Sequence, residues 1–507
     1  MKKAISMLLI LLMLGALLPS FALAAEGSAV LSSQGLRVDG RRAGCEAYSI
    51  EGSVYYKLRD IALLLRATGS RFSVEWDSEA RAVRVSTGEN YEPDGSELDW
   101  SGGDQSATAV PSSQTLLIDG VERDDFPAWN IGGNNYFRLE DLGAALGFQA
   151  DYDEASDTAI LRSRAYYAAP TEWLTQELIF TDSTGAYHHE IYTYDGDGRV
   201  LTNLSEGVSM LPGIPEGVEF RSTTYFHYDE LGRRTEYLLD HENGEGPRVA
   251  STFEYDVWGQ LIRNGGGEEN PGSYTTFTYD DDGNLTAAEQ VLETPVGVWT
   301  TGQYMEYDGK GNRTRLVSVR DGETVSQNEY TYDAEGQLLR EESRDGAGSL
   351  LSATDYDYEN GRQVRSTRDY GSYSAVTSYD YDEAGRLRAA VTESPDGSTT
   401  VLYTWNSEGK PLRQETVSGD GSRTVTVWSY DEAGRLLRQV TGDPEAPEAL
   451  TACTYDKAGR LLSEVYEESG GYRVENTYEY DEVRHKMTHT RTTTYPEASE
   501  TAFTAEG

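Results

Sequence analysis

The second half of the chain alternates large aromatic and polar residues in short runs, and each run ends in the same turn pattern. An aromatic residue and a tyrosine two positions later are followed by Asp, two variable residues, Gly, and a return segment rich in Leu, as in residues 428–437. Because side chains alternate across a strand, the aromatic residue and the tyrosine share one face. Asp with Gly three positions later predicts a tight turn in which Gly is left-handed. Each unit is therefore predicted to form one β-hairpin.

The unit recurs about every 25 residues between residues 185 and 485, which indicates a repeat architecture. About 12 hairpins predict about 24 strands, and a sheet of that width must twist and coil. We therefore expect a mainly β fold, an antiparallel β-hairpin repeat array coiled into a spiral or open shell. The residues that define the repeat most clearly are Tyr255, Asp256, Gly259, Tyr332, Asp333, Gly336, Tyr381, Asp382, Gly385, Tyr430, Asp431, Gly434, Tyr455, Asp456 and Gly459.

Residues 28–165 show a different pattern, in which short alternating segments surround stretches with helical spacing, and the whole pattern occurs twice. Helices are predicted to begin near Leu58 and Leu139, with Asp60 and Asp141 at their positive N-terminal ends. Each copy is small for a core of its own, so we expect a duplicated α+β domain whose copies pack on one another. Residues 166–184 are interpreted as a linker or first strand, and 486–507 as a polar tail.

The first 24 residues predict export from the cytoplasm. Lys2 and Lys3 precede an apolar stretch, and Ala22-Leu23-Ala24 forms a small-x-small cleavage site, the pattern of a secretory signal peptide. No later stretch reaches the roughly 18 apolar residues of a membrane span. We expect a secreted, extracellular protein, and association with the cell wall stays open. Two cysteines exclude a disulfide framework.

The formal net charge of -43 excludes some partners. Binding nucleic acid or anionic lipid requires Lys and Arg to neutralise phosphates, so neither is an expected partner. The acidic surface is interpreted as a solvated one that keeps the protein soluble.

The histidines do not form a recognisable metal site. His188 and His189 are adjacent, so on a strand they face opposite ways, and His485 and His489 would be about 13 Å apart. We expect no catalytic, cofactor-binding or metal-binding residues.

Acidic turns such as those at 195–198 and 280–283 are similar to calcium loops but lack the bidentate Glu at the twelfth position. They are interpreted as plain turns, and weak calcium binding stays open. Residues 87–92 match the signature around the quinone tyrosine of copper amine oxidases, yet the chain has no His-x-His pair to hold copper, so the match is interpreted as chance.

The duplicated domain resembles a known family. The pattern Tyr-x-x-Leu-Arg-Asp that starts at Tyr55, followed by an apolar helix, Trp76-Asp77 and a closing strand, resembles the stalk domain named after the copper amine oxidase N-terminus. That domain is common in secreted proteins of Gram-positive bacteria. The resemblance implies an accessory α+β module and not an oxidase.

The repeat array resembles the YD repeat of the Rhs family, which is shared with teneurins and the shells of bacterial toxin complexes. The resemblance spans roughly residues 185 to 485 and implies a β-shell. Toxin-enclosing members have longer arrays, an Asp-Pro core motif and a C-terminal toxin domain. Here Asp443-Pro444 lies in an inter-repeat loop.

These observations favour a non-enzymatic secreted or cell-surface scaffold whose array binds a cell-surface glycan or protein. An accessory or remnant of an Rhs-type contact-dependent toxin system is the alternative, and an unrecognised hydrolase is a third interpretation. The pattern does not identify the ligand-binding residues.

Overall fold

The computed structural model describes residues 27–98, 106–124, 126–165, 173–211, 214–241, 244–268, 270–443 and 446–496. The predicted signal peptide, residues 1–24, lies outside these ranges. The chain divides into two compact units, one up to residue 166 and one from residue 167. Among the described residues, no helix has the length and apolar character that crossing a bilayer requires.

The first unit contains two copies of one series of elements. Helices α2 (Leu58–Leu65) and α3 (Leu139–Leu146) begin at the predicted residues. The strands of the first copy are β1 (Gly27–Leu31), β2 (Gly35–Val38), β3 (Arg41–Ala43), β4 (Ala47–Ile50), β5 (Ser53–Lys57), β6 (Phe72–Asp77) and β7 (Ala82–Thr87). Those of the second copy are β8 (Ser106–Pro111), β9 (Thr115–Ile118), β10 (Val121–Arg123), β11 (Trp129–Ile131), β12 (Asn134–Phe137), β13 (Gln149–Asp153) and β14 (Thr158–Arg162).

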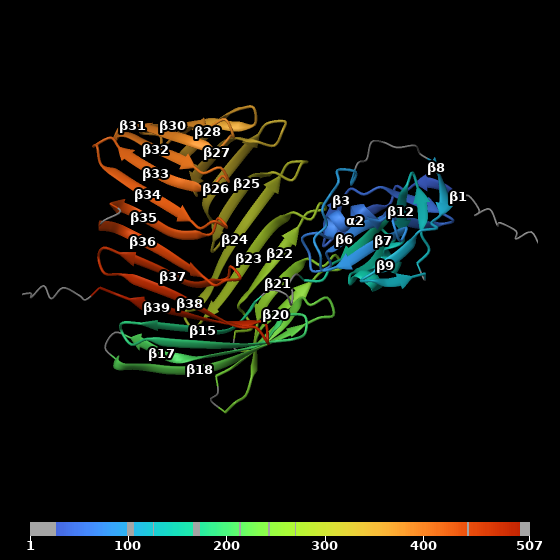
Figure 1. Ribbon diagram of the computed structural model, residues 1–507, viewed down its shortest axis with the longest axis horizontal. Helices are drawn as coiled ribbons and strands as arrows, with labels where there is room; N and C mark the ends of the chain where they lie inside the picture. The colour runs from blue at the N-terminus through green and yellow to red at the C-terminus, as the bar shows by residue number, and fades with distance from the viewer. Residues whose placement is uncertain are drawn as a thin grey trace, which may run out of the picture. The chain divides into compact units, whose positions relative to one another are not determined.

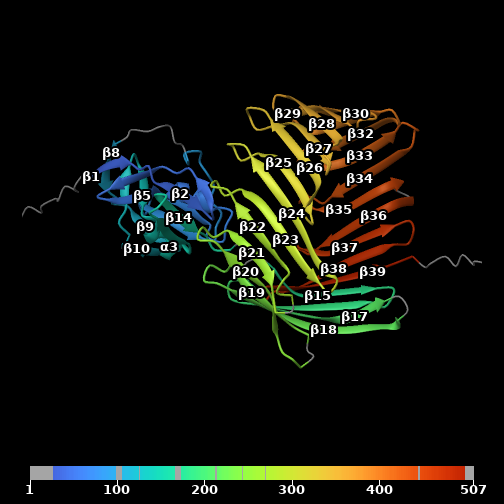
Figure 2. The same ribbon diagram turned by 180° about the vertical axis from the view of Figure 1, so that it is seen from behind.

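The two copies exchange strands rather than only packing on one another. Strand β14 of the second copy pairs in parallel with β2 of the first (Figure 2), and β7 of the first pairs in parallel with β9 of the second (Figure 1). Strands β1, β4 and β5 join β12, β11 and β8 in a small closed barrel. Both helices contribute to one shared core, in which Ile61, Leu65, Phe72, Leu142 and Leu161 are at most 1% exposed. The hydrophobic core of each copy therefore depends on the presence of the other copy.

Gly147 and Gly69, the glycines that follow the two helices, have different roles. Gly147 caps α3 in the left-handed conformation, with φ +75°. Gly69 does not cap α2, which ends at Leu65 with Arg66 as its C-cap. A Cβ atom at Gly69 would lie 2.2 Å from the carbonyl oxygen of Ala165, so glycine is required there because two backbones meet.

Among the described residues, the second unit is one sheet of 25 strands, β15 to β39, in which consecutive strands are antiparallel. Its first part consists of β15 (Leu174–Asp182), β16 (Tyr187–Tyr194), β17 (Val200–Leu211), β18 (Ile214–Tyr228), β19 (Arg234–Asp240), β20 (Arg248–Tyr255), β21 (Leu261–Gly266), β22 (Tyr274–Tyr279), β23 (Leu285–Thr294), β24 (Gly297–Tyr307), β25 (Arg313–Arg320), β26 (Glu323–Tyr332) and β27 (Leu338–Asp345). It continues through β28 (Leu350–Glu359), β29 (Arg362–Asp369), β30 (Ser374–Tyr381), β31 (Leu387–Ser394), β32 (Gly397–Trp405), β33 (Pro411–Ser418), β34 (Arg423–Tyr430), β35 (Leu436–Asp443), β36 (Ala446–Tyr455), β37 (Leu461–Glu468), β38 (Arg473–Asp481) and β39 (Lys486–Thr494).

The sheet closes on itself, which corrects the expectation of a spiral or open shell. Strand β15 pairs in parallel with β39, from Leu174 opposite Lys486 to Asp182 opposite Thr493 (Figure 1). We call this junction the seam. Residues 486–494, assigned to a polar tail from the sequence, form the closing strand β39. They alternate Thr with His and Arg, a polar pattern that suits a strand wetted on both faces but does not distinguish it from a tail.

Neither face of the closed sheet is covered by a second layer of described residues. Most strand positions are partly exposed on both faces, as in β19, where every residue from Arg234 to Asp240 is intermediate. An ordinary sandwich or filled barrel would bury one face completely. The second unit is therefore a hollow ring rather than a domain with a packed interior.

Candidate functional site

The motif tyrosines join each hairpin to the one before it. The Tyr430 hydroxyl donates to the main-chain carbonyl of Pro411, at 2.9 Å, and the Tyr455 hydroxyl donates to that of Leu436, at 3.0 Å. Each acceptor lies at the start of the return strand in the preceding repeat. The same bond is made by Tyr194, Tyr228, Tyr255, Tyr279, Tyr307, Tyr332, Tyr381 and Tyr480. The tyrosine thus ties neighbouring repeats together and is not only a packing group.

The motif Asp and Gly form the predicted turn. The Asp431 Oδ1 atom accepts hydrogen bonds from the amides of Ala433 and Arg435, and the amide of Gly434 donates to the Asp431 carbonyl. Gly434 has φ +76°. These amides and the Arg435 guanidinium hold the pKa of the Asp431 carboxyl below its usual value. Gly259, Gly336, Gly385 and Gly459 are likewise left-handed.

The residue after the turn glycine adds a second link between repeats. Arg435 pairs with Asp431 at 2.6 Å, and its guanidinium carbon lies 4.7 Å from the centre of the Tyr455 ring in the next repeat. Arg233 and Tyr255 repeat this contact at 4.5 Å. The stacked cation explains why the repeat prefers Arg at this position.

Two variants of the motif behave differently. Trp405 and Asn406 keep the frame: the Trp405 indole donates to the Leu387 carbonyl at 2.8 Å, and Asn406 accepts the turn amides. The repeat at Tyr358 instead closes on Asn360 and Gly361, both with positive φ, a two-residue hairpin turn.

The seam reproduces the link between repeats with residues from opposite ends of the ring. The Arg460 guanidinium lies against the rings of both Trp173 and Tyr480, 4.8 and 4.6 Å from their centres. On the other side, Lys486 lies 5.8 Å from the ring of Tyr194, whose hydroxyl bonds the carbonyl of Thr175. Closure thus uses the same interactions that hold the repeats together.

Closure also brings together histidines that the sequence keeps apart. His188 and His489 both contact Phe180, with ring centres 5.7 and 6.4 Å from it. His489 stacks on Tyr478 at 4.7 Å and hydrogen bonds Asn476 at 3.1 Å. Burial lowers the pKa of His489, and the positive charge of a neighbouring arginine adds to this effect.

As predicted, His188 and His189 face opposite ways: His188 contacts Ser205 at 2.8 Å, whereas His189 lies between Glu177 and Glu206. No group of three or more His, Cys, Asp or Glu residues in the described ranges is arranged to hold a metal ion. In the acidic turn at 280–283, both carboxylate oxygens of Asp280 accept hydrogen bonds from within the turn. Weak calcium binding stays a prediction.

The closed sheet contains a hollow on the face that carries the motif tyrosines, which we call the tyrosine face. It measures 360 Å³ and is lined by Ala288, Gln290, Thr301 and Gln303. Register places these residues on the same face as Phe277, the aromatic residue of that repeat. A second hollow of 410 Å³ lies at the seam and includes Phe180 and His188 in its lining.

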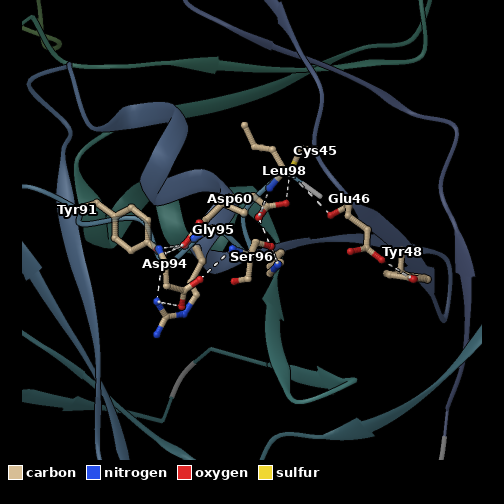
Figure 3. Close-up of polar contacts among 12 residues, drawn as sticks. Cys45, Glu46, Tyr48, Asp60, Tyr91, Asp94, Gly95, Ser96 and Leu98 are labelled. Carbon is tan, nitrogen blue, oxygen red and sulfur yellow. Dashed lines mark hydrogen bonds and ion pairs between the residues drawn. The ribbon is translucent and has the colours of Figure 1, made fainter. Parts of the chain in front are cut away.

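The first unit contains a buried polar cluster around Asp60, the acidic residue at the start of α2 (Figure 3). Asp60 is 1% exposed, accepts from the Leu98 amide at 3.2 Å and lies 3.7 Å from the Lys57 ammonium. Burial raises its pKa. Cys45 Sγ lies 3.7 Å from it, and burial raises the pKa of this thiol, which keeps it protonated and unreactive. The cluster fixes the segment that leaves the first copy.

Tyr91, the residue that the quinone-like signature centres on, is also structural. It is 4% exposed, donates to the Glu97 carboxylate and accepts from Arg59 at 3.1 Å. Burial and the Glu97 carboxylate raise its pKa to about 12.

Comparisons with known proteins yield only distant similarities. No family model matches the chain, and no curated protein matches it significantly. Among solved structures, a crystal structure of TcdB2-TccC3-TEV is 14% identical, with 87% of this chain and 23% of that chain covered and a TM-score of 0.34. A Photorhabdus luminescens Tc holotoxin pore is 11% identical over 89% of this chain and 30% of that chain, at 0.21. A porin-like protein from Bacteroides uniformis is 15% identical over 47% of this chain and 93% of that chain, at 0.20. The chain spans less than a third of the two toxin structures' chains, and these TM-scores do not define a common fold.

Proposed function

We propose that the second unit is a non-enzymatic shell, related to the Rhs-type toxin systems that its repeat resembles, and that it surrounds a polypeptide segment inside the ring. The observation that carries the proposal is the closure of the sheet between β15 and β39. An open array would favour a surface scaffold that binds ligands along its length, whereas a closed ring with two wetted faces favours enclosure. Binding of glycan or protein by the outside of the array stays a prediction.

The dimensions of the ring suit such a role. Twenty-five strands at a spacing of about 4.8 Å have a perimeter of about 120 Å, so a circular ring measures about 40 Å between opposite backbones. Side chains take about 5 Å on each side, half the usual spacing of packed sheets. The remaining width of about 30 Å accommodates an extended or compact polypeptide segment.

The tyrosine face is proposed to line the interior. The hollow at Ala288 and Gln303 lies on this face, and concave surfaces form on the inside of a ring. The opposite face carries cross-strand ion pairs such as Arg315 with Glu306 at 3.0 Å and Arg340 with Asp355 at 2.6 Å, which suit a surface in bulk water.

Accessibility of two adjacent residues tests the shell. Asn328→Cys places a thiol on the tyrosine face and Glu329→Cys places one on the opposite face of the same strand, with both native cysteines replaced by Ala. N-ethylmaleimide should label both, whereas a maleimide carrying a 5-kDa polyethylene glycol should label Glu329→Cys at least tenfold faster. Equal labelling by the large reagent would overturn the hollow shell.

A photo-crosslinking amino acid at the same two positions tests the occupant. In protein recovered from the producing cells, an adduct at position 328 that a protease digests supports an enclosed polypeptide. Adducts in equal amount at both positions, or none at 328, would contradict it.

A further inference from the structure

The duplication of the first unit creates two equivalent clefts, each built from both copies. Cleft 1 measures 580 Å³ and is lined by Gln34 and 52–54 of the first copy and by Glu140 and Tyr152 of the second. Cleft 2 measures 280 Å³ and is lined by the equivalent residues of the opposite copies. Gln114 and 133–135 come from the second copy, and Arg59 and Trp76 come from the first. Strand exchange is what joins these parts.

The residues of the two clefts occupy the same places in the repeated series. Gln34 immediately precedes β2, and Gln114 immediately precedes β9. Tyr152 lies on β13, and Trp76 lies on the corresponding strand β6. The lining of each cleft therefore includes one aromatic residue and one glutamine at equivalent positions.

The aromatic rings are exposed although they are large. Trp76 is 48% exposed and Tyr152 is 51% exposed, while the core positions of both copies are almost completely buried. A hydrogen bond of 2.8 Å from the Tyr152 hydroxyl to Asp157 holds its ring in place. An exposed, oriented ring in a cleft offers a flat apolar face to a ligand.

Each glutamine is held by a hydrogen bond to its Oε1 atom, although the two donors are not equivalent residues. The Gln34 Oε1 atom accepts from the Tyr56 hydroxyl at 2.6 Å, and the Gln114 Oε1 atom accepts from Asn135 Nδ2 at 2.5 Å. A fixed side-chain amide beside an aromatic face provides directional hydrogen bonding without charge.

Charge differs between the clefts, which restricts the ligand they share. The second residue of the helix is Glu140 in cleft 1 and Arg59 in cleft 2. Asp151 adds a second carboxylate to cleft 1, whereas Lys57 and Glu75 give cleft 2 groups of both signs, so no single charged ligand suits both clefts. We infer that the two clefts bind successive or parallel segments of a neutral glycan, with the Tyr152 or Trp76 ring against the C–H face of a sugar and the adjacent amide hydrogen-bonded to its hydroxyl or acetamido groups. The first unit would then attach the shell to a polysaccharide.

Calorimetry and saturation-transfer NMR on the full mature chain test this inference with tetrameric N-acetylglucosamine and cellotetraose as probes. At least one probe should bind with two sites per chain. Trp76→Ala and Tyr152→Ala should each remove one site, and the double variant should weaken binding at least tenfold. Trp299→Ala is the matched control, because Trp299 is 51% exposed but lies on β24 of the second unit.

Failure of both neutral probes to bind, or binding that the double variant retains, would overturn the inference. Loss of binding in Trp299→Ala instead would place a glycan site on the array and also contradict it. Spermidine serves as a cationic probe: tight binding that Glu140→Gln abolishes, with no sugar binding, would assign cleft 1 to a cation. None of these results depends on whether the ring encloses a polypeptide.

Discussion

The ring of Trp173 meets the ring of Tyr480 edge-on, with centres 5.0 Å apart, at the point where the two ends of the repeat array come together. Trp173 precedes β15, and Tyr480 is the last motif tyrosine, on β38. Arg460 lies against both rings. Trp173 thus packs against the last motif tyrosine at the point where β15 and β39 close the ring.

Removal of β39 should open the ring. A chain that ends after His485 loses the parallel partner of β15 and exposes two long strand edges, on β15 and β38, which favour aggregation. Size-exclusion chromatography with small-angle scattering should show a larger radius of gyration or association. A chain that ends after Pro496 is the control and should match the wild type. A compact monomer from the shorter chain would contradict the closure.

Loss of one motif hydroxyl should weaken the array by about 1 kcal/mol, the usual net contribution of a hydrogen bond. Tyr430→Phe keeps the ring but removes the donor to the Pro411 carbonyl. Tyr373→Phe changes a tyrosine that is 41% exposed in a turn and should be neutral. Urea unfolding of both variants measures the difference, and equal midpoints would show that the bond between repeats contributes nothing.

The turn glycines should tolerate alanine only at a cost. Gly434→Ala and Gly409→Ala each place a Cβ in a left-handed conformation, at about 1 to 2 kcal/mol. Gly434→Ala should cost more, because its Cβ would also displace the Lys410 ammonium. Gly196, in the first turn, has open space around it and no positive φ, so Gly196→Ala is the control. Thermal unfolding should rank the three in this order.

Acidification should weaken the seam. The pKa of His489 is lowered by burial, so the folded state binds this proton less readily than the unfolded chain does. The neutral His489 therefore contributes stability above the ordinary histidine pKa of about 6.5. This contribution is lost as the pH falls below that value, because the unfolded chain then binds the proton more readily. Tyr478 and Asn476 of β38, Glu464 of β37 and Phe180 of β15 face this imidazole.

The measurement is the melting temperature between pH 7.5 and 5.5, a range above the titration of ordinary carboxyls. His489→Gln should reduce the fall in melting temperature over this range. His241→Gln, in an exposed loop, should leave the fall unchanged. The same fall in all three proteins would exclude His489 as its source.

Local features of this protein follow from its sequence, and long-range ones do not. The turn at Asp431 and Gly434 and the helix starts at Leu58 and Leu139 depend on residues within a few positions of each other, and they were predictable. The pairing of Leu174 with Lys486 was not predictable, because the two strands lie at opposite ends of the repeat array and the repeat of about 25 residues carries no information about which distant strands pair.

The candidate clefts show the same limit. Trp76 and Tyr152 are recognisable as equivalent residues of a duplication, because each precedes an Asp at the same place in its copy. Only the exchange of strands places Trp76 near Gln114 of the other copy. The sequence indicates that two copies exist, but it does not show which parts of the two copies come together to form a cleft.

The intertwined first unit has a consequence for how such a domain can arise and fold. A single copy would leave β2 and β7 without their parallel partners and would have to find a second molecule to complete either sheet. Joining the copies in one chain turns that encounter into an intramolecular event at millimolar effective concentration. The covalent connection between the two copies thus replaces a dimerisation equilibrium, and folding of the unit does not depend on protein concentration.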